Sequence, residues 1–145
     1  MRRVAVIHGV NLNMLGKRPA EHYGSFTLDE LNQQIGAFAR EFSIETMFFQ
    51  TNHESKYVEL LQQAPEFADG LILNPGAWTH YSWAIRDALE TTGLPAVEVH
   101  LSDVESRDEF RKTSVIREIC FATVAGKGAD GYREALQALS DRWDA

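Results

Sequence analysis

Short apolar runs alternate with amphipathic stretches along the whole chain. Five of these runs are continuous and rich in branched or aromatic residues, at residues 4–7, 44–49, 71–73, 97–99 and 119–124. Strands that are buried on both faces of a parallel sheet have this pattern, whereas a half-exposed strand alternates apolar and polar residues. The runs therefore predict five strands of one parallel sheet that helices cover on both faces.

Sequence patterns that are typical of helices lie between these runs. Thr27 and Glu30 form a T-x-x-E capping box, which predicts the start of a helix. The apolar residues that follow recur every three or four positions, at Leu28, Leu31, Ile35, Phe38 and Phe42. Further helices are expected over residues 55–64, over residues 82–91 and from about residue 130. Ser106 and Glu109 suggest a second capping box, which would start a short helix that carries Arg111. The alternation predicts an α/β fold, a flavodoxin-like doubly wound five-stranded parallel sheet.

Residues 8–26 form the one long stretch without a regular pattern. A loop of this length in a compact domain is usually functional, so we expect it to act as a lid. The apolar run before it stops at His8, which is too short for a signal peptide and supports a strand instead. Because no linker or repeat interrupts the 145 residues, we expect one catalytic domain over residues 1–145.

Composition narrows the classes of partner. The formal charge of -7 and a sequence pI of about 5.2 argue against a nucleic-acid partner, because phosphate contacts require a basic surface. No apolar run is long enough to span a bilayer, so no membrane partner is expected. The single cysteine, Cys120, excludes an intrachain disulfide and a cysteine metal cluster, and it fits a cytoplasmic location. Because Cys120 lies in an apolar run, we expect an unreactive core thiol.

Polar residues gather where the predicted strands end, which is where open α/β sheets bind ligands. They are His8, Asn11 and Asn13 after the first strand, Gln50, Asn52 and His53 after the second, Asn74, Thr79 and His80 after the third, and His100 and Ser102 after the fourth. Any one of them can simply cap a turn or a helix. Together they favour a polar small-molecule site. The histidines lack metal-ligand spacing, so no metal is expected.

The segment Gly126 to Gly131 leaves a second function open. It matches G-x-G-x-x-G between a predicted strand and a helix, the pattern of many nucleotide sites. It follows the last predicted strand, however, and no later strand supplies an acidic residue for a ribose. We interpret the glycines as a tight turn with close helix packing. The alternative is a nucleotide- or phosphate-binding module without turnover.

Several sequence blocks carry a specific resemblance that extends over nearly the whole chain. They are residues 8–18 (HGVNLNMLGKR) with Tyr23 and Gly24, residues 49–54 (FQTNHE), 74–80 (NPGAWTH), 84–89 (AIRDAL), 98–102 (EVHLS), 109–111 (EFR) and 128–132 (GADGY). In order and spacing the chain resembles the type II 3-dehydroquinate dehydratases. The resemblance implies a flavodoxin-like lyase that converts 3-dehydroquinate to 3-dehydroshikimate in the shikimate or quinate pathway. It implies neither a metal nor an organic cofactor.

The resemblance also implies roles for individual residues. Tyr23 is the expected general base, Arg18 the cation that favours its ionised form, and His100 the general acid. Asn11 is expected near the reacting centre, and Glu98 is expected to orient His100. The expected substrate-binding residues are Asn74, His80, Asp87 and Arg111, with the backbone N–H groups of Leu101 and Ser102 holding the substrate carboxylate. The family forms trimers that pack into dodecamers, in which the aspartate matched by Asp87 reaches a neighbouring site.

The chemistry explains why these residue types are needed. A free tyrosine has a pKa near 10 and is a poor base at neutral pH, but a cation within about 4–6 Å lowers the pKa of a phenol. Three departures from the family pattern stand out: Val10 replaces a proline, Pro19 precedes an alanine where Glu-Pro is usual, and Asp103 replaces an asparagine. We expect Pro19 to alter the geometry of the lid. Asp103 is expected to bring negative charge close to the carboxylate site.

Overall fold

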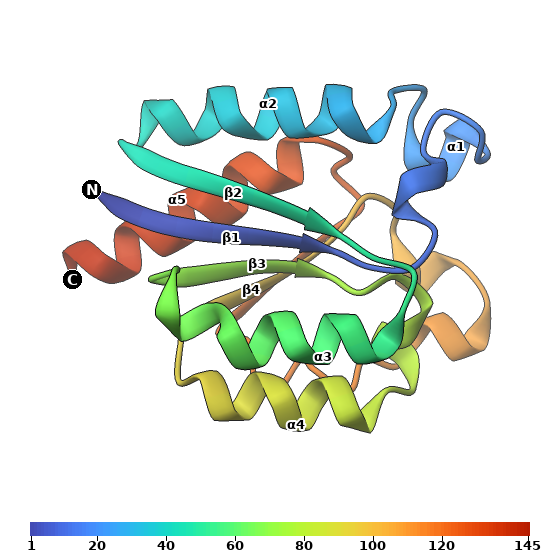
Figure 1. The fold of residues 1–145 in the computed structure, drawn as a ribbon. Coiled ribbons are helices and arrows are strands. Elements are labelled where there is room, and N and C mark those ends of the chain that lie inside the picture. The colour runs from blue at the N-terminus through green and yellow to red at the C-terminus, as the bar shows by residue number, and fades with distance from the viewer.

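The fold is a five-stranded parallel sheet in the order β2-β1-β3-β4-β5 (Figure 1). The computed structural model describes the backbone of residues 1–145 and every side chain except that of Glu105. The strands are β1 (Arg2–His8), β2 (Ile44–Gln50), β3 (Gly70–Asn74), β4 (Ala96–His100) and β5 (Ala122–Ala125). All neighbouring strands pair in parallel. The order confirms the predicted flavodoxin-like sheet, and the order of the strands reverses beside β1.

Helices cover both faces of this sheet. The α-helices are α1 (Ala20–Tyr23), α2 (Leu28–Glu41), α3 (Glu54–Gln63), α4 (Trp83–Thr92) and α5 (Asp130–Asp144). Short 3-10 helices are η1 (Leu12–Met14), η2 (Ala64–Glu66), η3 (Gly76–His80), η4 (Val104–Ser106) and η5 (Glu109–Lys112). Figure 1 shows α2 and α5 on one face and α3 with α4 on the other. Within the residues described, no helix is both long and apolar enough to cross a bilayer.

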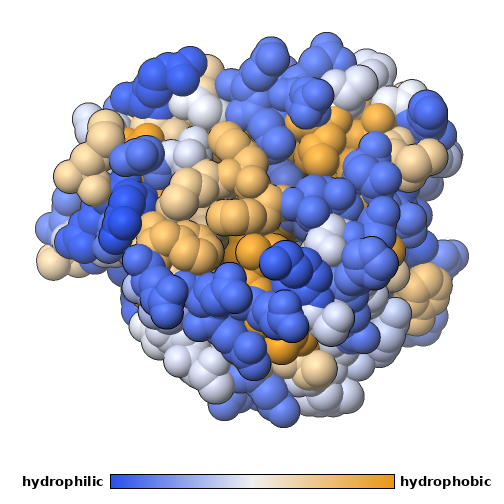
Figure 2. All heavy atoms as spheres, viewed as in Figure 1, coloured by the Kyte–Doolittle hydropathy of each residue, from blue (hydrophilic) through white to orange (hydrophobic). Residues whose placement is uncertain are grey.

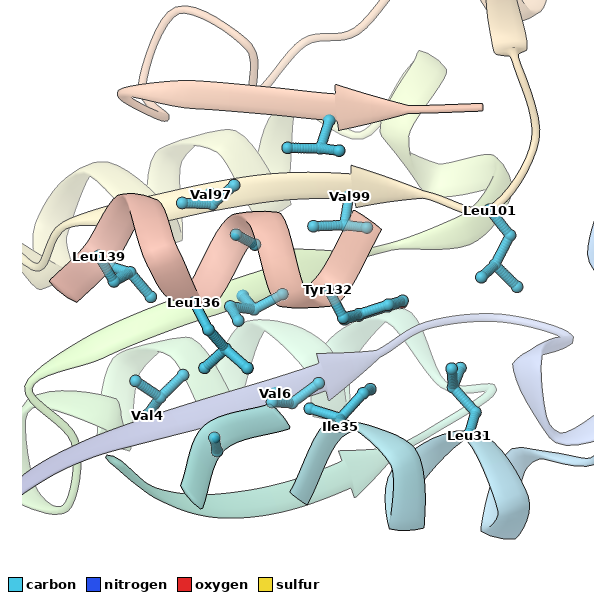
Figure 3. Close-up of a cluster of buried hydrophobic side chains, with 14 of the residues drawn as sticks. Val4, Val6, Leu31, Ile35, Val97, Val99, Leu101, Tyr132, Leu136 and Leu139 are labelled. Carbon is cyan, nitrogen blue, oxygen red and sulfur yellow. The ribbon is translucent and has the colours of Figure 1, made fainter. Parts of the chain in front are cut away.

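The predicted capping box at the start of α2 is present. The Thr27 hydroxyl accepts a hydrogen bond from the Glu30 amide at 3.2 Å, and the Glu30 carboxylate accepts one from the Thr27 amide at 3.1 Å. Leu31 and Ile35 of this helix are fully buried. In Figure 3 they lie close to Val6 of β1 and Tyr132 of α5, inside one hydrophobic cluster. The cap therefore sets where α2 begins, and its apolar stripe attaches it to the sheet.

Two local predictions are wrong. Ser106 and Glu109 do not form a capping box: the Ser106 hydroxyl donates to the carbonyl of Asp103 at 2.9 Å, and the chain makes the two short helices η4 and η5. The last strand starts at Ala122 and not at residue 119, because the Cys120 amide bonds back to the Ile116 carbonyl at 3.1 Å in a turn. Cys120 is buried, and burial raises the pKa of its thiol to about 12, as expected for an unreactive residue.

The glycine-rich segment before α5 is the predicted tight turn. Gly126 and Gly128 have φ angles of +78° and +57°, which L side chains rarely adopt. A Cβ on Gly131 would stand 3.3 Å from a methyl carbon of Val124, so glycine lets α5 approach the sheet closely. The amides of Gly126 and Gly128 donate to the carbonyls of Ser102 and Leu101 at 3.0 and 3.1 Å. These two N–H groups therefore support the loop after β4.

Strand β2 is an uncovered edge of the sheet, since it pairs only with β1. Met47, Phe48 and Phe49 on this strand are only partly buried. Figure 2 shows hydrophobic side chains gathered on the face where β2 runs between α2 and α3. An uncovered apolar edge of this kind is a surface on which another protein chain can pack.

Candidate active site

A pocket opens at the carboxyl ends of β1, β3 and β4, where the sequence places the polar residues. Of the predicted site residues, Asn11, Arg18, Tyr23, Asn74, His80, His100, Leu101, Ser102 and Arg111 all line it. They come from the loop after β1, the loop after β3 with η3, and the loop after β4 with η5. Segments far apart in the sequence thus meet at the point where the strand order reverses.

Two glycines allow the walls of this pocket to touch. A Cβ on Gly9 would stand 2.2 Å from the Pro75 carbonyl oxygen, and one on Gly76 would stand 2.6 Å from the Val10 carbonyl oxygen. Both distances are shorter than any real Cβ contact, so the loops after β1 and β3 pack backbone against backbone only because these residues are glycines. This contact sets the width of the pocket beside Asn11 and Asn74.

Tyr23 lies at the end of the short helix α1 and is largely buried. Two arginines from different parts of the chain surround it. Arg107 donates a hydrogen bond from Nη1 to the Tyr23 hydroxyl oxygen at 2.6 Å, and the Arg18 guanidinium carbon lies 3.6 Å from the centre of the ring. Burial lowers the pKa of Arg18 from its usual value. One guanidinium thus stands at the phenol oxygen and the other over the ring.

Arg107 is a site residue that the sequence reasoning missed. It also donates to the Ser102 hydroxyl at 3.3 Å, so it connects the segment after β1 that carries Tyr23 to the loop after β4. The sequence shows three basic residues close together, Arg107, Arg111 and Lys112, and only the path of the loop decides which one meets Tyr23. Pro19 is the N-cap residue of α1, and its carbonyl accepts from the His22 and Tyr23 amides of that helix.

His100 is held from behind by a buried carboxylate. Glu98 and His100 stand two positions apart on β4 and so point to the same face of the sheet. His100 Nε2 lies 2.6 Å from Glu98 Oε2, and Glu98 is fully buried. The other carboxylate oxygen, Oε1, accepts from the Ser114 hydroxyl at 2.8 Å. With Nε2 donating to Glu98, Nδ1 is the nitrogen left to exchange a proton in the pocket.

His80 has the opposite environment. Its Nδ1 donates to the Thr113 carbonyl at 2.7 Å, which leaves Nε2 as a hydrogen-bond acceptor. Burial lowers the pKa of His80, the positive charges of His100 and Arg111 lower it further, and the bond to Thr113 opposes the shift. The two histidines that line the pocket therefore have different environments: His80 is held neutral, and His100 is paired with a carboxylate.

Backbone and amide groups complete the pocket. The side-chain oxygen Oδ1 of Asn74 accepts from the Gly76 amide at 3.1 Å, so the NH₂ of the same side chain can donate to a ligand. The carbonyls of Leu101 and Ser102 are bonded to the glycine turn before α5. In the part of the chain that is described, the N–H groups of Leu101 and Ser102 have no partner. Two adjacent free N–H groups of this kind can bind a carboxylate.

Other predicted features lie outside the pocket. Asp87 is exposed on α4, and Glu98 stands behind His100. His53 precedes α3 and has no ring contact with the site. Asp103 follows Ser102, approaches Gly126 and is not among the residues that line the pocket, and its expected effect on the carboxylate site stays a prediction. Among the described residues, no group of three or more histidines, cysteines or acidic residues is arranged to hold a metal ion.

His8 is buried below the pocket, and not in it. Its Nε2 lies 2.8 Å from the Asn32 side-chain oxygen, and burial lowers the pKa of His8 to about 4. As the pH falls below about 6.5, the unfolded chain takes up a proton on His8 while the folded chain stays neutral until about pH 4. We therefore expect His8 to contribute a loss of about 3 kcal/mol in unfolding free energy between these two pH values.

The measurement is urea unfolding at several pH values. His8→Asn should remove most of this component of the pH dependence, whereas His53→Asn, at an exposed position, should leave it unchanged. If the two variants show the same pH dependence as the parent chain, His8 does not titrate as a buried neutral group.

Comparison with known proteins agrees with this geometry. The family model for class II dehydroquinases matches residues 2–140. A 3-dehydroquinate dehydratase of Pelotomaculum thermopropionicum is 48% identical over 95% of this chain and 96% of its own, and one of Thermotoga neapolitana is 48% identical over 93% and 92%. The crystal structure of the type II dehydroquinase of Butyrivibrio crossotus superposes with a TM-score of 0.92 at 39% identity, covering 95% of this chain and 97% of that one. The chain belongs to the class II dehydroquinase family.

Proposed function

We propose that this chain dehydrates 3-dehydroquinate to 3-dehydroshikimate, in the shikimate or quinate pathway and in the cytoplasm, without a metal or organic cofactor. The relatives named as 3-dehydroquinate dehydratases support the substrate. One observation carries the chemistry: a tyrosine flanked by two arginines and a histidine paired with a carboxylate line a single pocket. A base and an acid are what the removal of water from a β-hydroxyketone requires.

Tyr23 is the proposed base. Its phenolate oxygen takes the proton from the carbon next to the substrate ketone, and the electron pair of that C–H bond moves into the enolate. Arg107 donates directly to the oxygen, and Arg18 lies over the ring, so both guanidiniums stabilise the phenolate before the proton moves. The role assigned to Arg18 from the sequence is therefore shared in this proposal with Arg107.

Asn11 and His100 complete the reaction. The enolate oxygen needs donors in a site shielded from water, and the Asn11 side chain lines the pocket and can donate to it. When the enolate collapses, the C–O bond breaks and the hydroxyl leaves as water with a proton from Nδ1 of His100. Glu98 stabilises the positive charge that His100 carries before it gives up this proton.

The remaining lining residues are proposed to bind the substrate. The N–H groups of Leu101 and Ser102 hold its carboxylate. His80 accepts a hydrogen bond from a ring hydroxyl through Nε2, and the Asn74 side chain and Arg111 bind further oxygen atoms. The nucleotide-binding alternative is not favoured, because the amides of Gly126 and Gly128 are already bonded to the loop after β4 and are not free for a phosphate.

The experiment that tests the function is direct. Purified protein should convert 3-dehydroquinate to a conjugated enone, seen as a rise in ultraviolet absorbance, and excess chelator should not slow the rise. No absorbance change with 3-dehydroquinate would refute the proposed substrate.

Asp87 suggests that the site is completed by a second chain. It is exposed and makes no ion pair or hydrogen bond within the described residues. Two arginines that could pair with Asp87 within its own chain contact other carboxylates instead. Arg86 contacts Glu118 at 3.2 Å, and Arg111 contacts Asp108 at 3.3 Å. Tyr81 and Trp83, close by on the same surface, are 60% and 62% exposed. We propose that this surface joins subunits into trimers, and trimers into dodecamers, with Asp87 serving the neighbouring site.

Asp87→Ala should lower kcat/KM by roughly tenfold while the assembly mass and the melting temperature stay unchanged, because a single hydrogen bond to substrate or site is lost. Steady-state kinetics and multi-angle light scattering on the same sample measure both. Glu59→Ala, an exposed acidic residue on α3, is the control. A parent chain that is monomeric and fully active would contradict both the assembly and the shared site.

A further inference from the structure

The buried carboxylate behind His100 has a second partner, the Ser114 hydroxyl. We propose that Ser114 is a positioning residue that keeps Glu98 ionised and correctly oriented, and through it keeps His100 protonated for its role as acid. The inference rests on the proposed function, because it assigns that role to His100. Ser114 does not line the pocket, so it acts on the reaction only through Glu98.

Few groups are placed to stabilise a negative charge on Glu98. Its side chain is fully buried, and among the described residues each carboxylate oxygen has one side-chain partner: His100 on Oε2 at 2.6 Å and Ser114 on Oε1 at 2.8 Å. In the described part of the structure, no lysine or arginine forms an ion pair with it. Burying an ionised carboxylate without hydrogen-bond donors costs free energy. The Ser114 hydroxyl therefore provides a large share of the stabilisation that keeps Glu98 ionised.

The chain holds Ser114 in place on both sides. The carbonyl of Thr113, the residue before it, accepts from His80 Nδ1 at 2.7 Å. The amide of Val115, the residue after it, donates to the Thr79 carbonyl at 2.9 Å, and Arg86 donates to the Val115 carbonyl at 2.7 Å. Three consecutive residues thus connect to η3, to α4 and to β4. The hydroxyl is fixed before substrate arrives, as a positioning group should be.

Removing the hydroxyl has a definite chemical consequence. Oxygen Oε1 of Glu98 loses its donor inside an apolar environment, so the carboxylate binds a proton more readily. A protonated Glu98 no longer stabilises the imidazolium form of His100, and the fraction of enzyme that holds the acid proton at a given pH falls. Substrate contacts are untouched. The loss should therefore appear in kcat and in the pH profile, and not in KM.

The test compares Ser114→Ala, Ser114→Thr and Ser106→Ala with the parent chain. We expect Ser114→Ala to lower kcat by roughly tenfold at neutral pH with little change in KM, because a hydrogen bond to a charged group is lost. The basic limb of the pH–rate profile should move to lower pH. Ser114→Thr keeps a hydroxyl and should recover most of the activity. Ser106→Ala removes a hydroxyl from the exposed loop nearby and should behave like the parent.

A second readout separates this inference from the proposed function. The His100 ring can be titrated by NMR without substrate, using a His100→Gln variant to assign its signals. Ser114→Ala should shift the midpoint of that titration to lower pH, even if the parent chain fails to dehydrate 3-dehydroquinate. An unchanged midpoint, or parent-like kcat in Ser114→Ala, would overturn the positioning role. An inactive parent with a shifted midpoint would refute the proposed function alone.

Discussion

Replacing Tyr23 with phenylalanine should remove nearly all turnover, by roughly 10³-fold in kcat, while substrate binding changes little. General base catalysis contributes about 10²–10⁴-fold to such proton transfers. The substitution deletes only the oxygen that receives the proton. The ring that Arg18 covers remains, and so do the backbone and side-chain groups proposed to bind the substrate. Single-substrate kinetics and isothermal titration with a non-reacting substrate analogue measure the two effects separately.

Ser55→Ala removes a hydroxyl from an exposed residue of α3 outside the pocket and is the control. The base assignment would be refuted by a Tyr23→Phe variant with parent-like kcat. A variant that loses affinity for the analogue as strongly as it loses kcat would instead show that Tyr23 contributes to binding.

His100→Ala should show the second large effect, a loss of about 10²–10³-fold in kcat, because the departing hydroxyl no longer receives a proton from an acid. It should also lower the unfolding free energy by about 3 kcal/mol, since Glu98 would be left buried with Ser114 as its one side-chain partner among the described residues. Adding Glu98→Gln to His100→Ala removes the unpaired charge. The double variant should therefore regain stability without regaining turnover.

The comparison of His100→Ala with the double variant separates an effect on catalysis from an effect on folding. Urea unfolding and kcat are measured on the parent, the two single variants and the double variant. If His100→Ala keeps more than a third of the parent turnover, His100 is not the acid. If the double variant is as unstable as His100→Ala, the loss of stability comes from packing and not from the buried charge.

Most of the fold was predictable from the sequence because its signals are local. The capping box of Thr27 and Glu30 and the three-and-four spacing of Leu31 and Ile35 need only neighbouring residues to be recognised. The wrong boundary at residue 119 has a physical cause: an apolar run shows that a segment is buried, but not whether it is extended. The amides of Ile119 and Cys120 bond back to the Ile116 carbonyl in a turn, and hydrophobicity alone does not distinguish this turn from a strand.

The site was predictable where polar residues stand at or just after the end of a strand, as Asn74, His100 and Ser102 do. Position at a strand end was not sufficient, because His8 is buried beside Asn32 and His53 precedes α3. Arg107 and Ser114 were missed because both lie in the irregular segment between β4 and β5. Their contacts with Tyr23 and Glu98 depend on the path of that loop, which no periodic pattern encodes.

The proposed mechanism differs most clearly from dehydration through a lysine Schiff base, which sodium borohydride reduces irreversibly in the presence of substrate. None of the residues that line the pocket is a lysine. The decisive measurement is the rate of enone formation from 3-dehydroquinate after the protein has been treated with borohydride and substrate together, then freed of both. A chemistry based on Tyr23 and His100 predicts the same rate as in untreated protein, and a permanent loss of activity would contradict it.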